Sequence, residues 1–299
     1  MEAVEINSID GSNIRQEMHW LRLGMVTLNI SLELHRKRGQ RKQLVPVFVQ
    51  HGLKNELKNL RIASVGHTPQ GFGFGRAMDA DMQKVFGATL ESIEVRELID
   101  MAKGYTDDEC SEYLDKMTKS TVGLDKTPDN NRKDFARLCK AYKEYVDENN
   151  IGALSSRCWP DFFTAFGTPV CGVLAMLNDM GVAASCEADT YGALSMYIGM
   201  KLSEQAVFFG DPVSLDESEN TITFWHCGTA ACSISREDTG ATIGVHPNRK
   251  IGPVMDFGCK AADKVTVFRV GQKADGSFRF LSQQEVLSTS LSSFAEHQL

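Results

Sequence analysis

The chain has no long apolar stretch and no excess of positive charge. None of its hydrophobic runs approaches the roughly 20 residues that a membrane-spanning helix requires, so we expect no membrane partner. Lys and Arg number 32 against 39 Asp and Glu, a formal net charge of -7, which argues against nucleic acid as the main partner. The N-terminus, MEAVEINSID, lacks the basic-then-apolar layout of a secretion signal. We therefore expect a cytoplasmic protein.

The sequence also lacks the cysteine spacing of a zinc ribbon or a disulfide framework. Its eight cysteines are scattered, and none forms a C-x-x-C pair. In a long chain without a secretion signal, this pattern is typical of reduced and often buried thiols. We predict free cysteines throughout, with Cys186 and Cys227 at least partly buried.

The length of 299 residues suits one large domain or two medium ones. Residues 1–54 are predicted to form a helical or linker segment. Apolar spacing indicates a helix over residues 13–34, and residues 44–49 could form a strand. The basic run between them, residues 36–42, could bind phosphate or a partner. A solvated linker is favoured because no aromatic residue interleaves with the charges.

Residues 55–157 predict a Rossmann-like α/β domain. A buried strand over 60–66 leads through a Gly-rich turn to a helix over 79–86 and a second strand over 90–95, an alternation typical of a parallel sheet. Such sheets bind ligands at the carboxyl ends of their strands. The turn has G-x-G-x-G spacing but neither the G-x-G-x-x-G pattern nor a ribose-binding acid after it. We interpret it as a loop that lines a pocket, not as a nucleotide site.

The remainder of the chain changes from helices to strands. Helices are predicted over residues 106–118, 132–149, 170–180 and 190–202, and a short strand over 181–185. The segment 158–299 is predicted to be a C-terminal domain that is mainly antiparallel β after Asp211, with strands over 221–226, 241–245, 264–270 and 278–281. The last two strands are expected to pair across the turn at 274–277.

Two acids stand two residues apart in an otherwise apolar context, ASCEADTYGAL. If the backbone is extended there, Glu187 and Asp189 share a face, and converging carboxylates repel unless a cation or a proton lies between them. Oxygen ligands suit Mg²⁺ or Mn²⁺. The alternative is that Asp189 caps the following helix while Glu187 is solvated.

His226 follows an apolar strand in TFWHCGTAA and could complete a mixed nitrogen and oxygen metal site. The alternative is an imidazole that only makes hydrogen bonds. Zinc is weakly supported, because no second Cys/His pair has matching spacing.

Several short motifs follow one another around these residues. CWPDFFTAFGTPVCGVLAMLNDMGVAASCEADTYGALSMYIGMKLSEQAVFFGD and NTITFWHCGTAA contain an aromatic-x-Asp segment, a Cys-Gly helix, a C-E-x-D turn, an F-x-D strand end and H-C-G. This combination resembles the L-fucose/L-arabinose isomerase superfamily. LRIASVGHTPQGFGFGRAMDADMQKVFGATLESIEV resembles the middle α/β domain of that family. The likeness covers roughly residues 55–280.

The resemblance implies a metal-dependent isomerase that interconverts an aldose and a ketose through an enediolate. In that family a Mn²⁺-like ion binds two neighbouring sugar oxygens, and a carboxylate moves a proton between C2 and C1. Carried over by position, Asp189 is the best candidate for a metal ligand, and Glu187 for a second ligand or the acid/base. His226 is a candidate for both metal and substrate binding. Trp159 and Asp161 fall where the family lines its sugar pocket, and a homo-oligomer is expected.

Departures from the family keep a second interpretation open. Cys171 stands where some members use a glutamate ligand. The chain is also shorter than the family's members at both ends and lacks the segment that carries their late histidine. The alternative prediction is therefore a shortened, non-catalytic member that binds a sugar or a partner chain.

Overall fold

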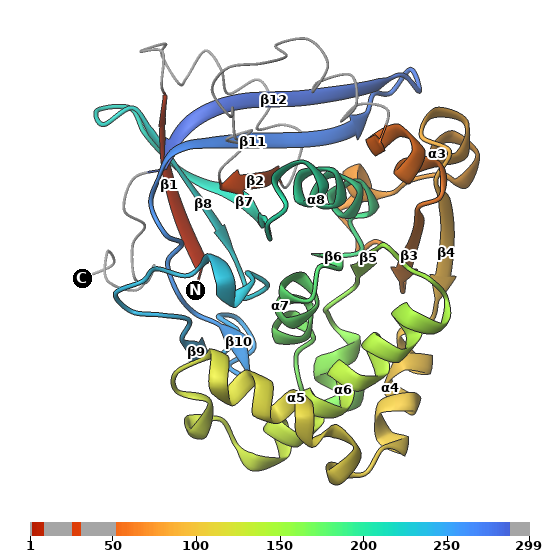
Figure 1. Ribbon diagram of the computed structural model, residues 1–299, viewed down its shortest axis with the longest axis vertical. Helices are drawn as coiled ribbons and strands as arrows, with labels where there is room; N and C mark the ends of the chain where they lie inside the picture. The colour runs from red at the N-terminus through yellow and green to blue at the C-terminus, as the bar shows by residue number, and fades with distance from the viewer. Residues whose placement is uncertain (1, 9–25, 31–51, 288–299) are drawn as a thin grey trace.

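A computed structural model describes the backbone of residues 2–8, 26–30 and 52–287, and the side chains of residues 52–282. Figure 1 shows a group of helices around a short parallel sheet, and beside it a set of longer antiparallel strands. This mixed α/β architecture agrees with the fold class expected from the sequence. No described helix has both the length and the apolar character needed to cross a membrane.

The parallel sheet has the strand order β4-β3-β5-β6. Its strands are β3 (Arg61–Val65), β4 (Thr89–Ile93), β5 (Ala153–Ser156) and β6 (Ala183–Cys186). Every residue of β5 and β6 is buried, which explains their small residues, ALSS and AASC. Strand β6 comes from beyond residue 157, so the sheet continues across the position where the sequence suggested a domain boundary.

Five of the six described α-helices after residue 78 begin and end within three residues of a predicted helix, whereas the helix over Val95–Gly104 was not predicted from the sequence. The six are α3 (Asp79–Val85), α4 (Val95–Gly104), α5 (Asp107–Ser120), α6 (Asp129–Glu148), α7 (Cys171–Asp179) and α8 (Thr190–Ser203). Helix α5 begins at a capping box, in which Thr106 and Glu109 satisfy each other's free backbone amides. A short helix at 52–58 precedes β3, and single turns lie at Gly73–Gly75, Leu124–Lys126, Phe162–Phe166 and Cys232–Ile234.

Six of the described strands close into an antiparallel barrel in the order β1-β12-β11-β2-β7-β8. They are β1 (Glu2–Ser8), β2 (Val26–Ile30), β7 (Phe208–Asp216), β8 (Thr221–His226), β11 (Ala262–Gln272) and β12 (Phe278–Leu287). Strands β9 (Ile243–Gly244) and β10 (Val254–Met255) form a separate small pair. The predicted hairpin across residues 274–277 is confirmed, with Gln272 opposite Phe278.

The N-terminal segment corrects one expectation. A helix was expected over residues 13–34, but Val26–Ile30 is strand β2, paired with both β11 and β7. Its sequence, VTLNI, alternates and contains β-branched residues, which suit a strand, and its partners lie far along the chain. The expected basic run at 36–42 and strand at 44–49 lie outside the described residues.

Helix α8 joins the two parts of the fold (Figure 1). It packs on β3, β5 and β6 of the parallel sheet and on β2, β7 and β11 of the barrel. Most of its residues are buried, as expected for a helix that is apolar nearly all round. Gly192 allows the close approach, because a Cβ there would lie 2.6 Å from the Phe209 ring. The first turn of α8 is therefore held between the two sheets.

Candidate active site

A pocket of about 290 Å³ opens where the carboxyl ends of the parallel strands meet the barrel. Trp159 follows β5 and Glu187 follows β6, while Asp211 and His226 come from β7 and β8. The Gly-rich turn contributes Phe72, as expected of a loop that lines a pocket. The described residues that line the pocket are Phe72, Trp159, Glu187, Asp211, Trp225, His226, Cys227, His246, Asn248 and Arg249.

The backbone between the two expected acids is tightly turned. Glu187 and Ala188 have φ of 61° and 50°, so two consecutive non-glycine residues adopt the left-handed conformation. Such strain concentrates at functional sites, where the surroundings hold it in place. Here Thr68 donates a hydrogen bond to the Ala188 carbonyl at 3.3 Å. The backbone is therefore not extended here, and the condition under which Glu187 and Asp189 would share a face is not met.

Both carboxylate oxygens of Asp189 are engaged in contacts that stabilise the fold. Its carboxylate accepts from the Gly192 amide at 2.8 Å, so it caps α8. Arg269 of β11 donates to both of its oxygens, and the side chains of Asp189 and Arg269 are 0% and 1% exposed. Buried opposite charges held this way compensate each other. The capping alternative for Asp189 is thus the one that the structure shows.

Glu187 lies in a different environment, with 7% of its surface exposed. Its Oε1 lies 3.8 Å from the Cys158 thiol and 4.0 Å from the Cys186 thiol. Its Oε2 has no hydrogen-bond partner in the described part of the chain. Burial first, and then negative charge at Cys158 and Cys227, raise the pKa of Glu187 to about 9. This carboxyl is therefore available to a cation or a proton.

His226 meets Glu187 from the barrel side. Its Nδ1 lies 3.1 Å from the Thr229 hydroxyl and 3.6 Å from the Cys227 thiol. A proton on Nδ1 donated to Thr229 leaves the lone pair on Nε2, an atom without a partner among the described residues. Burial opposes charge on this ring, but Cys227, Glu187 and Asp211 outweigh it and raise the pKa of His226 to about 10 in the ion-free protein. An ion that binds Nε2 therefore has to displace a proton from the ring.

One carboxylate, one imidazole and two thiols converge at this point. Ligand atoms of Cys186, Glu187, His226 and Cys227 all lie within 4.8 Å of one another. The structure therefore brings Glu187 and His226 together, as the sequence suggested. Asp189 is not part of this group in the described regions. A carboxylate oxygen and an imidazole nitrogen are donors for a divalent ion, once the ion displaces the protons that the raised pKa values keep on both groups.

The thiols beside the site are packed against one another. Cys171, where a glutamate ligand was expected from the resemblance, has its Sγ 3.8 Å from that of Cys227. All eight cysteines lie in the described part of the chain, and none is in a disulfide; seven are buried, and Cys232 is partly exposed. The predicted burial of Cys186 and Cys227 is confirmed.

Sequence reasoning did not select Asp211 as a site residue. Burial raises the pKa of Asp211 to about 6, although His226 opposes that change. Its carboxyl lines the same pocket as Glu187 and His226. The available signal was the F-x-D motif at the end of an apolar strand, which the sequence showed but did not connect to the acids at 187 and 189.

The two other residues expected to bind substrate, Trp159 and Asp161, lie in different surroundings. Trp159 lines the pocket, and its ring faces the Arg249 guanidinium at 5.8 Å. Asp161 forms an ion pair with Arg157 at 3.0 Å and is not among the described residues of the lining. Arg157 also contacts the His67 ring at 3.0 Å. Because Arg157 also donates to the Trp159 carbonyl at 3.2 Å, the Asp161–Arg157 pair supports the backbone at Trp159.

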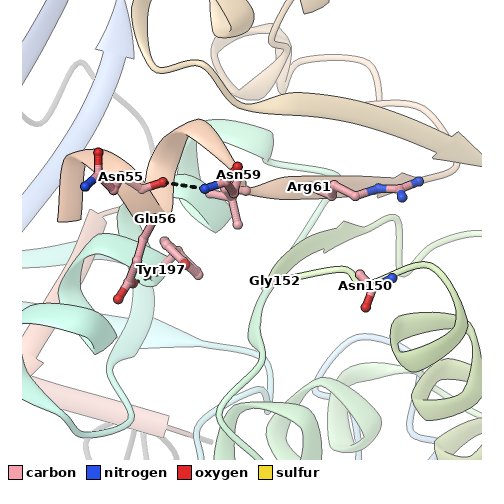
Figure 2. Close-up of a pocket in the computed structure, with 8 residues that line it drawn as sticks. Asn55, Glu56, Asn59, Arg61, Asn150, Gly152 and Tyr197 are labelled. Carbon is pink, nitrogen blue, oxygen red and sulfur yellow. Dashed lines mark hydrogen bonds between the residues drawn. The ribbon is translucent and has the colours of Figure 1, made fainter. Parts of the chain in front are cut away.

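A second pocket, of about 380 Å³, lies at the opposite, amino-terminal edge of the parallel sheet (Figure 2). Leu60 and Arg61 at the start of β3 and Gly152 before β5 line it. Glu56 is paired there with Lys201 at 3.2 Å, and Arg61 with Glu91. In Figure 2 the Glu56 and Arg61 side chains extend apart from each other. This pocket lacks a convergent set of unpaired acids among the described residues, which favours the first pocket as the active site.

Comparison with known proteins points to sugar isomerases, although no protein-family model matches the chain. The chain is 64% identical over 238 residues to a sulfoquinovose isomerase of Clostridium sp. (strain MSTE9), a match that covers 79% of the chain and 53% of that protein. It is 35% identical over 274 residues to the sulfoquinovose isomerase of Alkalicoccus urumqiensis, covering 91% of the chain and 61% of the relative. A sulfoquinovose isomerase of Priestia aryabhattai is 37% identical over 238 residues, 79% of the chain and 53% of that relative.

The chain thus spans little more than half the length of the curated relatives it matches. All three of these relatives are named as isomerases of the same sugar. Membership of the L-fucose/L-arabinose isomerase superfamily, which the motifs suggested, stays a prediction.

Proposed function

We propose that this chain carries the active site of an isomerase that interconverts the aldose and ketose forms of sulfoquinovose or a close analogue. Sulfoquinovose is a glucose derivative with a sulfonate on carbon 6. The names of the relatives support the reaction and the sugar class. The observation that carries the proposal is that Glu187 and His226 have ligand atoms within 4.8 Å of each other at a pocket of small-molecule size. Each side chain also has a buried atom, Oε2 and Nε2, without a hydrogen-bond partner among the described residues.

We propose a divalent ion, Mn²⁺ in the first place, between Glu187 and His226. The fit rests on the orphaned oxygen and nitrogen, since carboxylate and imidazole are donors that such an ion accepts. The thiols of Cys186 and Cys227 lie close enough to favour softer ions as well. When bound, the ion would act as a Lewis acid toward the oxygens on C1 and C2 of the open-chain sugar.

The proton transfer is assigned to Asp211. Its pKa of about 6 lies near working pH, which suits a group that takes a proton from C2 and returns it to C1. The reaction then passes through an enediolate. Glu187 and His226 fix the end of the sugar that reacts, and Trp159 covers one side of the pocket.

Asp189 has a positioning role in this proposal. Its ion pair with Arg269 and its cap on α8 hold the left-handed turn that orients Glu187. The expected oligomer and cytoplasmic location remain predictions that follow from the sequence alone.

The test measures Mn²⁺ binding by calorimetry and ketose formation from sulfoquinovose. His226→Asn should lose both, because the imidazole nitrogen is removed. His67→Asn is the matched control, since His67 is exposed and lies outside the lining. Loss of neither property in His226→Asn would contradict the proposal. Sugar binding without turnover in the wild type would favour the non-catalytic alternative.

A further inference from the structure

A tight turn presents Arg249 to the active-site pocket. The His246 amide donates to the Ile251 carbonyl at 2.8 Å, and the Lys250 amide donates to the His246 carbonyl at 2.7 Å. The buried His246 ring packs edge-on against Phe163, with 5.0 Å between ring centroids. The turn between β9 and β10 is thus anchored at its base, and its exposed residues keep a defined position.

Arg249 is a cation without an anionic partner in the described regions. The other arginines around the site are engaged: Arg157 with Asp161, and Arg269 with Asp189. The contact shown for Arg249 is the face of the Trp159 ring, 5.8 Å from its guanidinium carbon. Stacking on an aromatic ring orients the guanidinium plane and leaves its N–H groups free to donate.

The pocket has a buried floor and an exposed mouth. Glu187 and His226 are 7% and 1% exposed and form its floor. Asn248 and Arg249 are exposed and lie at its mouth. A sugar whose reacting end reaches the floor therefore places its other end near the guanidinium.

We propose that Arg249, with Asn248 beside it, binds the anionic group at the far end of the substrate and selects a sulfonated hexose over a neutral one. This inference rests on the proposed function, because it takes the sugar's reacting end to lie at Glu187 and His226. A guanidinium can donate two parallel hydrogen bonds to an oxyanion, and an amide can donate a third.

The charge count favours a sulfonate over a phosphate. Arg249 is the one Lys or Arg among the described residues of the lining. One positive charge balances a sulfonate, which carries a single negative charge, whereas a phosphate monoester carries about 1.5 to 2 near neutral pH.

The experiment measures binding of sulfoquinovose and of glucose by tryptophan fluorescence, because Trp159 and Trp225 line the pocket. A chelator is present so that no turnover occurs. Arg249→Gln should weaken sulfoquinovose binding roughly 10- to 100-fold, the loss of a charged hydrogen bond, and glucose binding by less than about threefold. Arg249→Lys keeps the positive charge but loses the two parallel N–H donors of the guanidinium. Its affinity for sulfoquinovose should therefore lie between those of the wild type and Arg249→Gln.

Lys250→Gln is the matched control, since it removes a positive charge from the same turn outside the lining. It should change either affinity by no more than about twofold. Equal loss of both sugars in Arg249→Gln, no loss of either, or an equal effect of Lys250→Gln would overturn the inference.

The two proposals fail separately. If the wild type prefers sulfoquinovose over glucose through Arg249 but forms no ketose, the anion-site proposal stands and the isomerase proposal fails. If the wild type forms ketose but Arg249→Gln still prefers sulfoquinovose over glucose, the isomerase proposal stands and the anion-site proposal fails.

Discussion

Replacing Glu187 by Gln should stabilise the ion-free protein, and increasingly so as the pH rises. Burial raises the pKa of Glu187 to about 9 from an ordinary value of 4.5. The folded state therefore holds this proton more tightly than the unfolded state. By linkage, the free energy of unfolding falls as the pH rises from about 4.5 to about 9. The amide introduced by Glu187→Gln does not titrate, and its carbonyl still accepts from the neighbouring thiols.

The magnitude follows from the proton that the folded protein must retain. Each pH unit above 4.5 lowers the free energy of unfolding of the wild type by about 1.4 kcal/mol. At about pH 8 the loss of stability is therefore at most about 5 kcal/mol. With 7% of its surface exposed, Glu187 is only weakly screened by solvent. The difference between Glu187→Gln and wild type should be near zero at about pH 5 and several kcal/mol at about pH 8.

Urea unfolding with a chelator at the two pH values measures this difference. Glu112→Gln, on the exposed face of α5, is the control and should change stability little at either pH. Saturating Mn²⁺ should stabilise the wild type and not Glu187→Gln, since binding to the folded state adds to stability. A difference between Glu187→Gln and wild type that is independent of pH would refute the reasoning.

Contacts of the site lead to three further predictions. Asp211→Asn should abolish ketose formation but keep sugar binding. In the wild type, the rate of ketose formation should rise with pH through about 6, because Asp211 loses its proton there and can act as a base. A rate that does not change with pH in this range would contradict the role given to Asp211. Arg269→Gln leaves Asp189 buried without its cation and should cost about 3–5 kcal/mol in urea unfolding, while the double variant with Asp189→Asn should recover part of that loss. Gly192→Ala should destabilise by about 1–3 kcal/mol because its Cβ meets the Phe209 ring, whereas Gly104→Ala, with open space around it, should not.

The sequence predicted best those elements whose pattern is local. Helix α8 was predicted to within one residue, because its apolar spacing and its capping acid are local signals. The pairing of β11 with β12 was also predicted, because a turn signal lies between two alternating segments, although β12 runs six residues beyond its predicted end. Strand β2 was missed because its partners, β11 and β7, lie far along the chain. Closure of the barrel, not local spacing, decides the structure of Val26–Ile30.

The candidate site could be predicted only in part, because its side-chain pairings also depend on residues far apart in the sequence. Glu187 and His226, both named from the sequence, have ligand atoms within 4.8 Å of each other, but the direction of Glu187 depends on two left-handed residues that are not glycine. Nothing in the residue types at 187 and 188 signals that turn. Arg269 is 80 residues from Asp189, and its alternating strand gives no sign that an inward-facing arginine will meet that acid. Such pairings are properties of the tertiary fold.

The most direct test of the central claim is to follow sulfoquinovose in D₂O with the Mn²⁺-loaded chain by NMR. Proton transfer at this pocket predicts the ketose as product, with solvent deuterium entering at C1 of the ketose and at C2 of the recovered aldose, and no reaction in Asp211→Asn. A folded, Mn²⁺-loaded chain that leaves both the sugar and its C2 hydrogen unchanged would contradict the account.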